Sequence, residues 1–226
     1  MKERIMQKSS ILPVTSVALL LVSVYLILGY VPTESTMGWV QRVFYFHVPI
    51  AWLSYLAFFI VFVCSIFYLS TRERKWDIIA RSAAEVGVVF TALVLVTGSI
   101  WAKSSWGTWW EWNERLTSEL VLWLVYIAYL MVRSFATEED RGARSAAVIG
   151  IAGFFSVPIS ALSIRLWDTV HPQVDIFKGG LAPEMLFTLL FCIVAFTVLF
   201  VQFLLMRISM RNVEVEIAKL RYSFRR

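Results

Sequence analysis

The sequence predicts an all-α protein that spans a membrane as a bundle of about six transmembrane helices, with both termini in the cytoplasm. Its composition is the first reason: 59% of the 226 residues are hydrophobic and 16% are charged, and the mean hydropathy is +0.71. A soluble domain of this size needs more polar surface. The other two reasons are a series of long apolar runs and the uneven placement of basic residues around them.

The apolar runs meet the length that a membrane span requires, which is roughly 20 residues. In chain order they cover residues 11–30, 48–70, 83–101, 119–135, 145–163 and 184–206. The short loops between them leave no room for a separate soluble domain. We therefore predict that residues 1–226 form a single transmembrane domain.

The first run also fits a cleaved signal peptide, because Lys2, Arg4 and Lys8 precede it. It is long for the core of a signal peptide, however, and no small-x-small cleavage site follows. We therefore expect residues 11–30 to be a retained first helix.

The remaining runs differ in how sharply their ends are defined. Pro49 suits the first turn of the second helix. The fourth run is short, and Arg165 and Asp168 bound the fifth. The existence of these helices is better determined than their ends.

Basic residues set the predicted orientation. If the N-terminus, residues 71–82, 133–144 and 207–226 share one side, sixteen basic residues lie there and five on the other. The first group is Lys2, Arg4, Lys8, Arg72, Arg74, Lys75, Arg81, Arg133, Arg141, Arg144, Arg207, Arg211, Lys219, Arg221, Arg225 and Arg226, and the second is Arg42, Lys103, Arg115, Arg165 and Lys178. Positive residues favour the cytoplasmic side. The net charge of +5 then reflects topology and anionic lipid, not nucleic acid.

The chain has two histidines, and both fall on the predicted outer side. His47 precedes Pro49 at the start of the second run, and His171 lies in the loop before the last run, after Trp167. Neutral imidazole is a good iron ligand, so two such groups at one membrane boundary fit the two faces of a haem. Each could instead be an interfacial histidine bonded to backbone or water.

The outer loop 102–118 holds four tryptophans within seven residues, namely Trp106, Trp109, Trp110 and Trp112. An aromatic belt at the membrane interface explains one or two of them. On a surface helix the spacings of three and four would pair Trp109 with Trp112 and Trp106 with Trp110. Such a face could lie against a porphyrin.

Charged and sulfur side chains complete the candidate set. Arg42, Arg115 and Arg165 could pair with haem propionates, although an ordinary interfacial role fits each equally. Glu111, Glu114 and Glu119 could serve acid–base chemistry, although solvated loop charge explains them more simply. Cys64 and Cys192 lie singly in apolar spans, which predicts buried thiols rather than a disulfide or redox pair. No hydrolase, zinc-protease or phosphate-loop motif is present.

Residues 106–120 (WGTWWEWNERLTSEL) resemble the tryptophan-rich signature of the haem-handling membrane proteins of cytochrome c biogenesis. Within that superfamily the chain looks most like the CcmC family, the haem exporter protein C of cytochrome c maturation. Residues 42–49 and 167–171 resemble the segments that carry the family's two haem-ligand histidines. Length, six helices and motif order extend the resemblance over the whole chain. The family usually has Asp where this chain has Asn113, which puts in doubt any role needing a carboxylate there.

The resemblance implies that His47 and His171 are axial ligands of haem b and that the tryptophan loop forms its platform. It implies a multi-pass protein of the bacterial inner membrane, with the haem site facing the periplasm. It also implies four partners: a periplasmic haem chaperone like CcmE, ABC-type subunits like CcmA and CcmB, and a small membrane protein like CcmD. We expect a delivery protein rather than an enzyme, one that at most promotes attachment of haem to the chaperone.

Three other functions compete with delivery. A membrane electron-transfer cytochrome would ordinarily need haem ligands at two depths, and the two histidines supply one. A transporter of haem or another solute would need broken helices and paired polar residues at mid-membrane, in which these spans are poor. The larger haem lyases share the tryptophan signature but are usually longer and carry more histidines.

Overall fold

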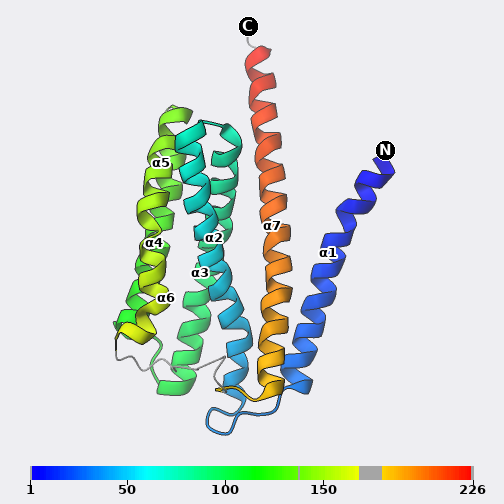
Figure 1. Cartoon of the computed structure of the whole chain (residues 1–226), viewed down its shortest axis with the longest axis vertical. Helices are drawn as coiled ribbons and strands as arrows, with labels where there is room; N and C mark the ends of the chain where they lie inside the picture. Colours follow the sequence, from blue (N-terminus) through cyan, green and yellow to red (C-terminus); the bar gives the residue numbers. More distant parts are fainter. Residues whose placement is uncertain (1, 137, 168–179, 225–226) are drawn as a thin grey trace.

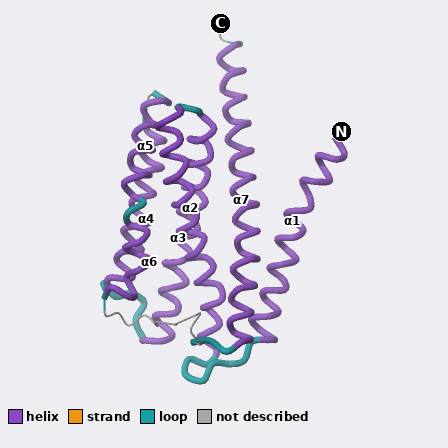
Figure 2. Tube along the Cα trace, viewed as in Figure 1, coloured by secondary structure: helices purple, strands orange, loops and turns teal. Residues whose placement is uncertain are grey.

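The computed structural model of the chain describes residues 2–136, 138–167 and 180–224. In the described residues, a single isolated bridge between Glu34 and Gly38 is the nearest approach to a strand, and Figure 2 shows helices throughout. The elements in order are α1 (Lys2–Tyr25), a π-helical turn (Leu26–Tyr30), a 3-10 helix (Trp39–Val43), α2 (Phe44–Thr71), α3 (Arg74–Trp106), α4 (Glu114–Phe135), α5 (Glu139–Gly153), α6 (Ser156–Leu166) and α7 (Pro183–Ser223).

Six segments are long and apolar enough to cross a bilayer, which confirms the predicted all-α bundle of about six spans. They are Ile11–Tyr30, Trp39–Thr71, Arg74–Trp106, Glu114–Phe135, Glu139–Ser163 and Pro183–Arg221. Most helices run beyond the apolar runs of the sequence, because hydropathy marks only the part in hydrocarbon. The predicted loops at 71–82 and 133–144 and the tail after 206 are therefore largely helical.

The fifth span is two helices rather than the continuous helix that the sequence suggested. The α-helix is interrupted at Phe154 and Phe155. Val157 donates its N–H to the Phe154 carbonyl, three residues earlier, at 3.0 Å, which makes a tighter turn than an α-helix. Pro158 has no N–H to donate to the carbonyl of Phe154, which lies four residues earlier. The break between α5 and α6 follows from that missing bond.

The helices form two groups in Figure 1. Helices α2 to α6 make a compact bundle, in which the rings of Phe58 (α2) and Tyr126 (α4) stack with centroids 3.5 Å apart. The close approach of α2 and α3 depends on Gly87, since a Cβ there would lie 2.7 Å from the Phe58 ring. Helix α7 packs on α2 and α3, and α1 covers α7 from the other side. Figure 1 shows α1 tilting away from α7 toward the N-terminus.

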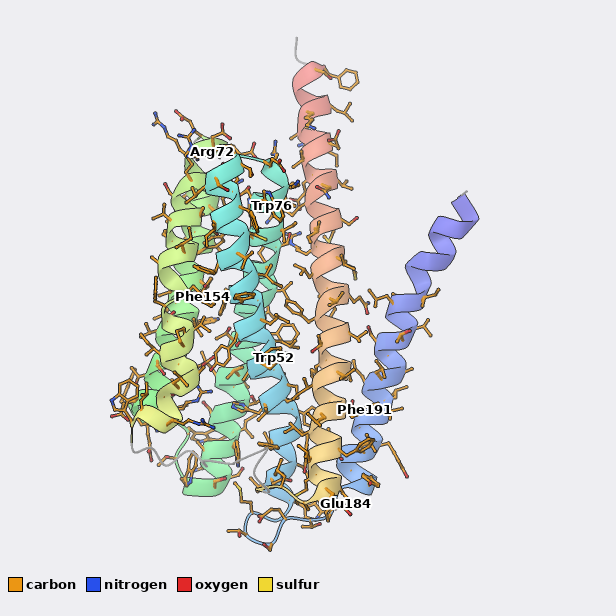
Figure 3. The ribbon with its side chains drawn as sticks, in the orientation of Figure 1. Trp52, Arg72, Trp76, Phe154, Glu184 and Phe191 are labelled. Carbon is orange, nitrogen blue, oxygen red and sulfur yellow. The ribbon has the colours of Figure 1, made fainter. Side chains whose placement is uncertain are left out.

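Both termini lie at the same end of the bundle in Figure 1, as six spans require. We call this the termini end, and the opposite end, where α3 stops and α7 starts, the site end. Figure 3 shows Arg72 and Trp76 near the termini end and Glu184 at the site end. The buried carboxylate of Asp77 pairs with Arg133 at 2.8 Å near the termini end. That the termini end is cytoplasmic stays a prediction from the basic residues.

Candidate functional site

His47 lies in the first turn of α2 rather than in a loop, and its side chain is 5% exposed. The sequence placed the start of the second helix near Pro49, but the helix begins at Phe44 and follows a 3-10 turn at Trp39–Val43. Proline is tolerated there because it lies near the beginning of the helix, where few backbone bonds are lost. The imidazole is therefore held on a rigid helix at the site end.

A hydrogen bond fixes the chemical form of the His47 ring. Its Nδ1 lies 2.8 Å from the Thr97 hydroxyl oxygen on α3. That hydroxyl uses its single hydrogen toward the Leu93 carbonyl, 2.7 Å away, so the bond to the ring must have Nδ1–H as its donor. The neutral ring then carries its lone pair on Nε2. A ring nitrogen fixed in this way by an outer hydrogen bond is the usual arrangement of a metal-binding histidine.

The ring also fits closely against α3. The Cε1 atom of His47 would lie 3.3 Å from a Cβ at position 98, so Gly98 allows the imidazole to approach the helix backbone. The ring of Trp101 stands edge-on to the imidazole, with centroids 6.0 Å apart. Together with Thr97, these contacts allow His47 little freedom to rotate.

His47 lines a cleft between α3 and the start of α4. The residues that form its walls are His47, Val94, Leu95, Gly98, Trp101, Ala102, Trp106, Asn113, Arg115, Leu116 and Glu119. The cleft thus brings together one histidine, one tryptophan and one arginine of the predicted set. It has about 30 Å³ of space for solvent, which is room for a few waters at most. A porphyrin therefore cannot be enclosed in it and would have to lie over its mouth.

Arg115 is anchored by a buried polar cluster behind this cleft. Its Nη1 lies 3.2 Å from Glu119 and donates to the Tyr55 hydroxyl at 3.0 Å and to the Ser160 carbonyl at 2.9 Å. The Ser160 hydroxyl donates to the same carboxylate oxygen, Oε2 of Glu119, at 2.6 Å. The other oxygen, Oε1, is buried without a hydrogen-bond partner among the described residues. The cluster balances the arginine charge and holds the guanidinium at the cleft wall.

Arg42 occupies a different environment from Arg115. It is 9% exposed, donates to the backbone carbonyls of Ile27 and Val31, and stacks on the Trp39 ring with 3.8 Å to its centroid. These contacts satisfy two carbonyls where the first helix ends in its π-helical turn. Arg42 therefore has a structural role in joining this turn to the start of the second span.

The tryptophan segment is not the surface helix that its spacing suggested. Trp106 is the last residue of α3, Gly107 ends that helix with a φ of 81°, and α4 begins at Glu114. Residues 107–113 between them are not helical. A left-handed glycine stops α3, so the spacings of three and four do not bring the predicted ring pairs together.

The tryptophans instead take different positions at the site end. Trp106 lines the cleft, while Trp109 is 60% exposed and Trp112 is 77% exposed. The rings of Trp110 and Trp112 meet edge to face, with centroids 5.5 Å apart. Large exposed indoles beside the cleft are an apolar surface that a flat ligand can cover.

Asn113, the departure from the family pattern, is the N-cap of α4. Its Oδ1 accepts the backbone N–H of Leu116 at 2.9 Å, and the residue also lines the cleft. Asparagine and aspartate cap helices about equally well. The helix-capping role of residue 113 therefore does not need the carboxylate that the family usually has.

A larger hollow lies at the same end on the other side of Trp101. It measures about 660 Å³, and its walls are Pro32, Thr33, Glu34, Ser35, Thr36, Met37, Gln41, Phe44, Trp101, Gly180, Leu181, Ala182 and Met185. The backbone N–H of Met37 lowers the pKa of Glu34, a partly exposed carboxyl in this loop. The described wall residues include no histidine.

The second predicted ligand, His171, lies outside the described residues. Trp167 follows the last turn of α6 at the site end and is 41% exposed, and Arg165 is exposed on that helix. The structure thus brings together His47, Trp106 and Arg115 in one cleft and leaves the placement of His171 a prediction.

Sequence reasoning missed the residues that orient the site. Thr97 lies 50 positions from His47, and Tyr55 and Ser160 lie 60 and 45 positions from Arg115. Each of these side chains is an ordinary polar residue within an apolar span, and no local spacing marks it. Glu119 is not a solvated loop charge but the ion-pair partner of Arg115, and the four-residue spacing of the two on α4 is the signal that could have indicated this pair.

Comparison with known proteins gives the chain its family. Residues 3–223 match the family described as Heme exporter protein C. The Heme exporter protein C of Bradyrhizobium diazoefficiens is 36% identical over 173 residues, which cover 75% of this chain and 66% of that protein. The Heme exporter protein C of Escherichia coli strain K12 is 32% identical over 201 residues, covering 89% and 81%.

A plant relative extends the same likeness. The putative cytochrome c biosynthesis ccmC-like mitochondrial protein of Marchantia polymorpha is 32% identical over 158 residues, which cover 70% of this chain and 67% of that protein. The names of these relatives join heme export to cytochrome c biosynthesis, and six membrane-spanning helices fit such a protein. Because the family match covers nearly the whole chain, this chain belongs to the heme exporter protein C family of cytochrome c biogenesis.

Proposed function

We propose that this chain binds haem b at the site end of the bundle, on the periplasmic face of the bacterial inner membrane, and delivers it to a haem chaperone. His47 and His171 supply the two axial ligands. The observation that supports the proposal is the hydrogen bond of His47 Nδ1 to Thr97, whose hydroxyl donates to the Leu93 carbonyl. A neutral imidazole with its Nε2 lone pair defined by Thr97 has the chemistry that haem iron requires.

The cleft indicates how the haem would lie. Since the cleft is far too small to enclose a porphyrin, the macrocycle lies over its mouth with one edge exposed. Trp109 and Trp112 offer apolar area beside it, and Trp106 forms part of the wall. An exposed edge suits a protein that passes its cargo on, whereas a resident electron-transfer haem is usually more enclosed.

Arg115 is the arginine best placed for a propionate. It lines the cleft and is fixed by Glu119 and Tyr55 on one nitrogen. A guanidinium has five N–H donors in a fixed fork, so this anchoring leaves other donors for a ligand carboxylate. Arg42 is the weaker candidate, because its donors serve the carbonyls of Ile27 and Val31.

The partners follow from the family. The chain would pass haem to a chaperone like CcmE and work beside ABC-type subunits like CcmA and CcmB and a small membrane protein like CcmD. Trp167 and His171 belong to the connection that enters α7 and would close over the haem from the side opposite His47. The protein itself would act by presenting the haem in one orientation, with covalent attachment completed on the chaperone.

A loading assay tests delivery. The chain and its haem chaperone are produced together in a bacterium whose own exporter gene is deleted, and covalent haem on the chaperone is measured by haem stain. His47→Ala should reduce loading at least about tenfold, whereas Trp76→Ala at the termini end should leave it unchanged. Equal loading by wild type and His47→Ala, at equal protein levels, would contradict the proposal.

A further inference from the structure

Helix α7 carries an exposed apolar stripe with a regular repeat. Met206, Met210, Val213, Ile217, Leu220 and Phe224 follow one another at intervals of four, three, four, three and four residues. Residues at these intervals lie on one helix face, and a repeat of seven is the pattern by which two helices pair along a seam. We call these six residues the α7 seam; Phe224 directly follows Ser223, the last residue of α7. They are between 45% and 86% exposed.

The half of the seam nearer the C-terminus lies outside the hydrocarbon core of the membrane. From Pro183 to Arg211 the helix has a length of about 43 Å, which already exceeds the roughly 30 Å of a bilayer core. The charged residues Arg207, Arg211, Glu214 and Glu216 also begin at this level. Lipid chains can cover Met206 but cannot reach Ile217 or Leu220. An apolar stripe of this length in water indicates a protein contact.

The other half of the seam, which contains Met206 and Met210, continues into a groove within the membrane. A hollow of about 470 Å³ lies between α3 and α7, and it is almost entirely apolar. Its walls are Ile50, Glu85, Val86, Val89, Phe90, Leu93, Phe196, Leu199, Phe203, Met206, Arg207 and Met210. Phe196, Leu199 and Phe203 extend the same three–four spacing toward the site end. The groove and the seam are therefore one continuous surface on α7.

The rest of the chain leaves this surface open. Helix α1 lies beside α7 at the site end but diverges from it toward the termini end, as Figure 1 shows. Helix α3 is joined to α7 by ion pairs from Glu85 to Arg207 and Arg211. Beyond these pairs, Arg211, Glu214, Val215 and Ala218 line a separate hollow between the two helices and are not seam residues. Figure 1 also shows the last turns of α7 extending past the ends of α2 and α3.

We propose that the groove and the α7 seam together bind a single helix of a partner membrane protein, which crosses the bilayer beside α3 and continues along α7 outside it. One helix explains both halves, because a lipid could fill only the groove and a soluble protein could cover only the exposed half. Beyond Glu216, the described charged side chains of α7 are Lys219, which pairs with Glu216 at 2.8 Å, and Arg221. The partner helix should therefore carry an acidic residue beside its apolar seam at the level of Arg221. This inference does not depend on the haem site.

Site-specific photocrosslinking tests the proposal in the complete membrane system. The photoreactive amino acid p-benzoylphenylalanine replaces Phe203 in the groove, or Ile217 or Phe224 in the seam, in cells that make all the cytochrome c maturation proteins. Asn212, exposed on another face of α7, is the matched control position. We expect the three test positions to link to the same polypeptide, with contact sites three or four residues apart on one helix, and Asn212 to give no such product.

A charge variant supplies the second arm. Ile217→Glu should lower the yield of the crosslink from position 224 by about tenfold or more, because a carboxylate would be buried in the seam. Since Ile217 is exposed, the apparent thermal midpoint of the purified variant should stay at the wild-type value. Crosslinks to a second copy of this chain, crosslinks to lipid alone, or different polypeptides from positions 203 and 217 would each overturn the proposal.

Discussion

At the residue scale, the ligand character of His47 depends on a threonine 50 positions away. The Thr97 hydroxyl oxygen accepts a hydrogen bond from Nδ1–H, because the hydroxyl donates its own hydrogen to the Leu93 carbonyl. The direction of this bond decides which ring nitrogen keeps a lone pair. With its tautomer reversed, the same imidazole would carry its hydrogen on Nε2, and that nitrogen could not bind iron.

Replacing Thr97 by valine should therefore weaken haem binding without unfolding the protein. Valine keeps the shape of threonine but removes the acceptor, and loss of such an outer partner typically costs about 10–100-fold in metal affinity. Haem titration of the detergent-purified apoprotein, followed by its Soret absorption, measures the change. Thr97→Ser retains the hydroxyl and serves as the control, with affinity close to wild type. Equal affinities for all three proteins would show that this bond does not orient the ligand.

The exposed tryptophans give a second test at this scale. Trp109→Ala or Trp112→Ala should lower the ratio of haem to protein after purification more than Trp76→Ala, since Trp76 lies at the opposite end and stacks on Phe67. The reason is the loss of flat apolar area beside the cleft. Haem is measured by pyridine haemochrome and protein by amino-acid analysis. A similar loss of haem in all three variants would show that the two exposed indoles are ordinary interfacial residues with no specific role in haem binding.

At the scale of the elements, the connection between α3 and α4 shows what spacing alone could not predict. The pairs of tryptophans had helical spacing, yet Gly107 ends α3 and Asn113 starts α4, so the segment between them is a loop. Both signals were present in the sequence as a glycine C-cap and an asparagine N-cap. These two caps end one helix and start the next. Without a continuous helix between them, tryptophans spaced three and four residues apart do not come to lie on one helix face.

The cap at Asn113 can be tested directly. Asn113→Asp should retain wild-type haem binding and thermal stability, because aspartate accepts the same Leu116 N–H. Asn113→Ala should destabilise the start of α4 by about 1 kcal/mol and release the cleft wall that contains Arg115. Thermal unfolding in detergent, with haem content measured in parallel, distinguishes the two. An alanine variant as stable as wild type would show that the cap contributes little.

The spans illustrate which part of an element a sequence defines. Apolar runs located six spans, because lipid exposure requires them. The helices nevertheless extend beyond these runs, by nine residues at the start of α3 (74 against 83) and by seventeen at the end of α7 (223 against 206). Helices continue through the interface where side chains such as Arg74 and Arg211 form ion pairs. The break between α5 and α6 follows from Pro158. Because residues 145–163 form one apolar run, their hydropathy alone predicts one continuous helix and does not indicate the break.

At the scale of the whole molecule, the fold was largely predictable and the site only in part. Composition, apolar runs and charge distribution are properties of long segments, so they identified the bundle. The cleft depends on contacts between distant residues, such as Tyr55 with Arg115 and Ser160 with Glu119. Such pairs have no periodic signature in one sequence, which is why the positioning residues emerged only with the three-dimensional structure.

The molecule as a whole brings His47 near the start of α2, the end of α6 and the start of α7 to one end of the bundle. The central claim is that a single haem there has His47 and His171 as its two axial ligands. Electron paramagnetic resonance of the oxidised, haem-loaded protein reports axial ligation directly. The claim predicts a low-spin bis-imidazole signal for wild type, a high-spin signal for His47→Gly and for His171→Gly, and return of the low-spin signal when imidazole is added to either. A wild-type low-spin signal retained by both variants without imidazole would contradict it.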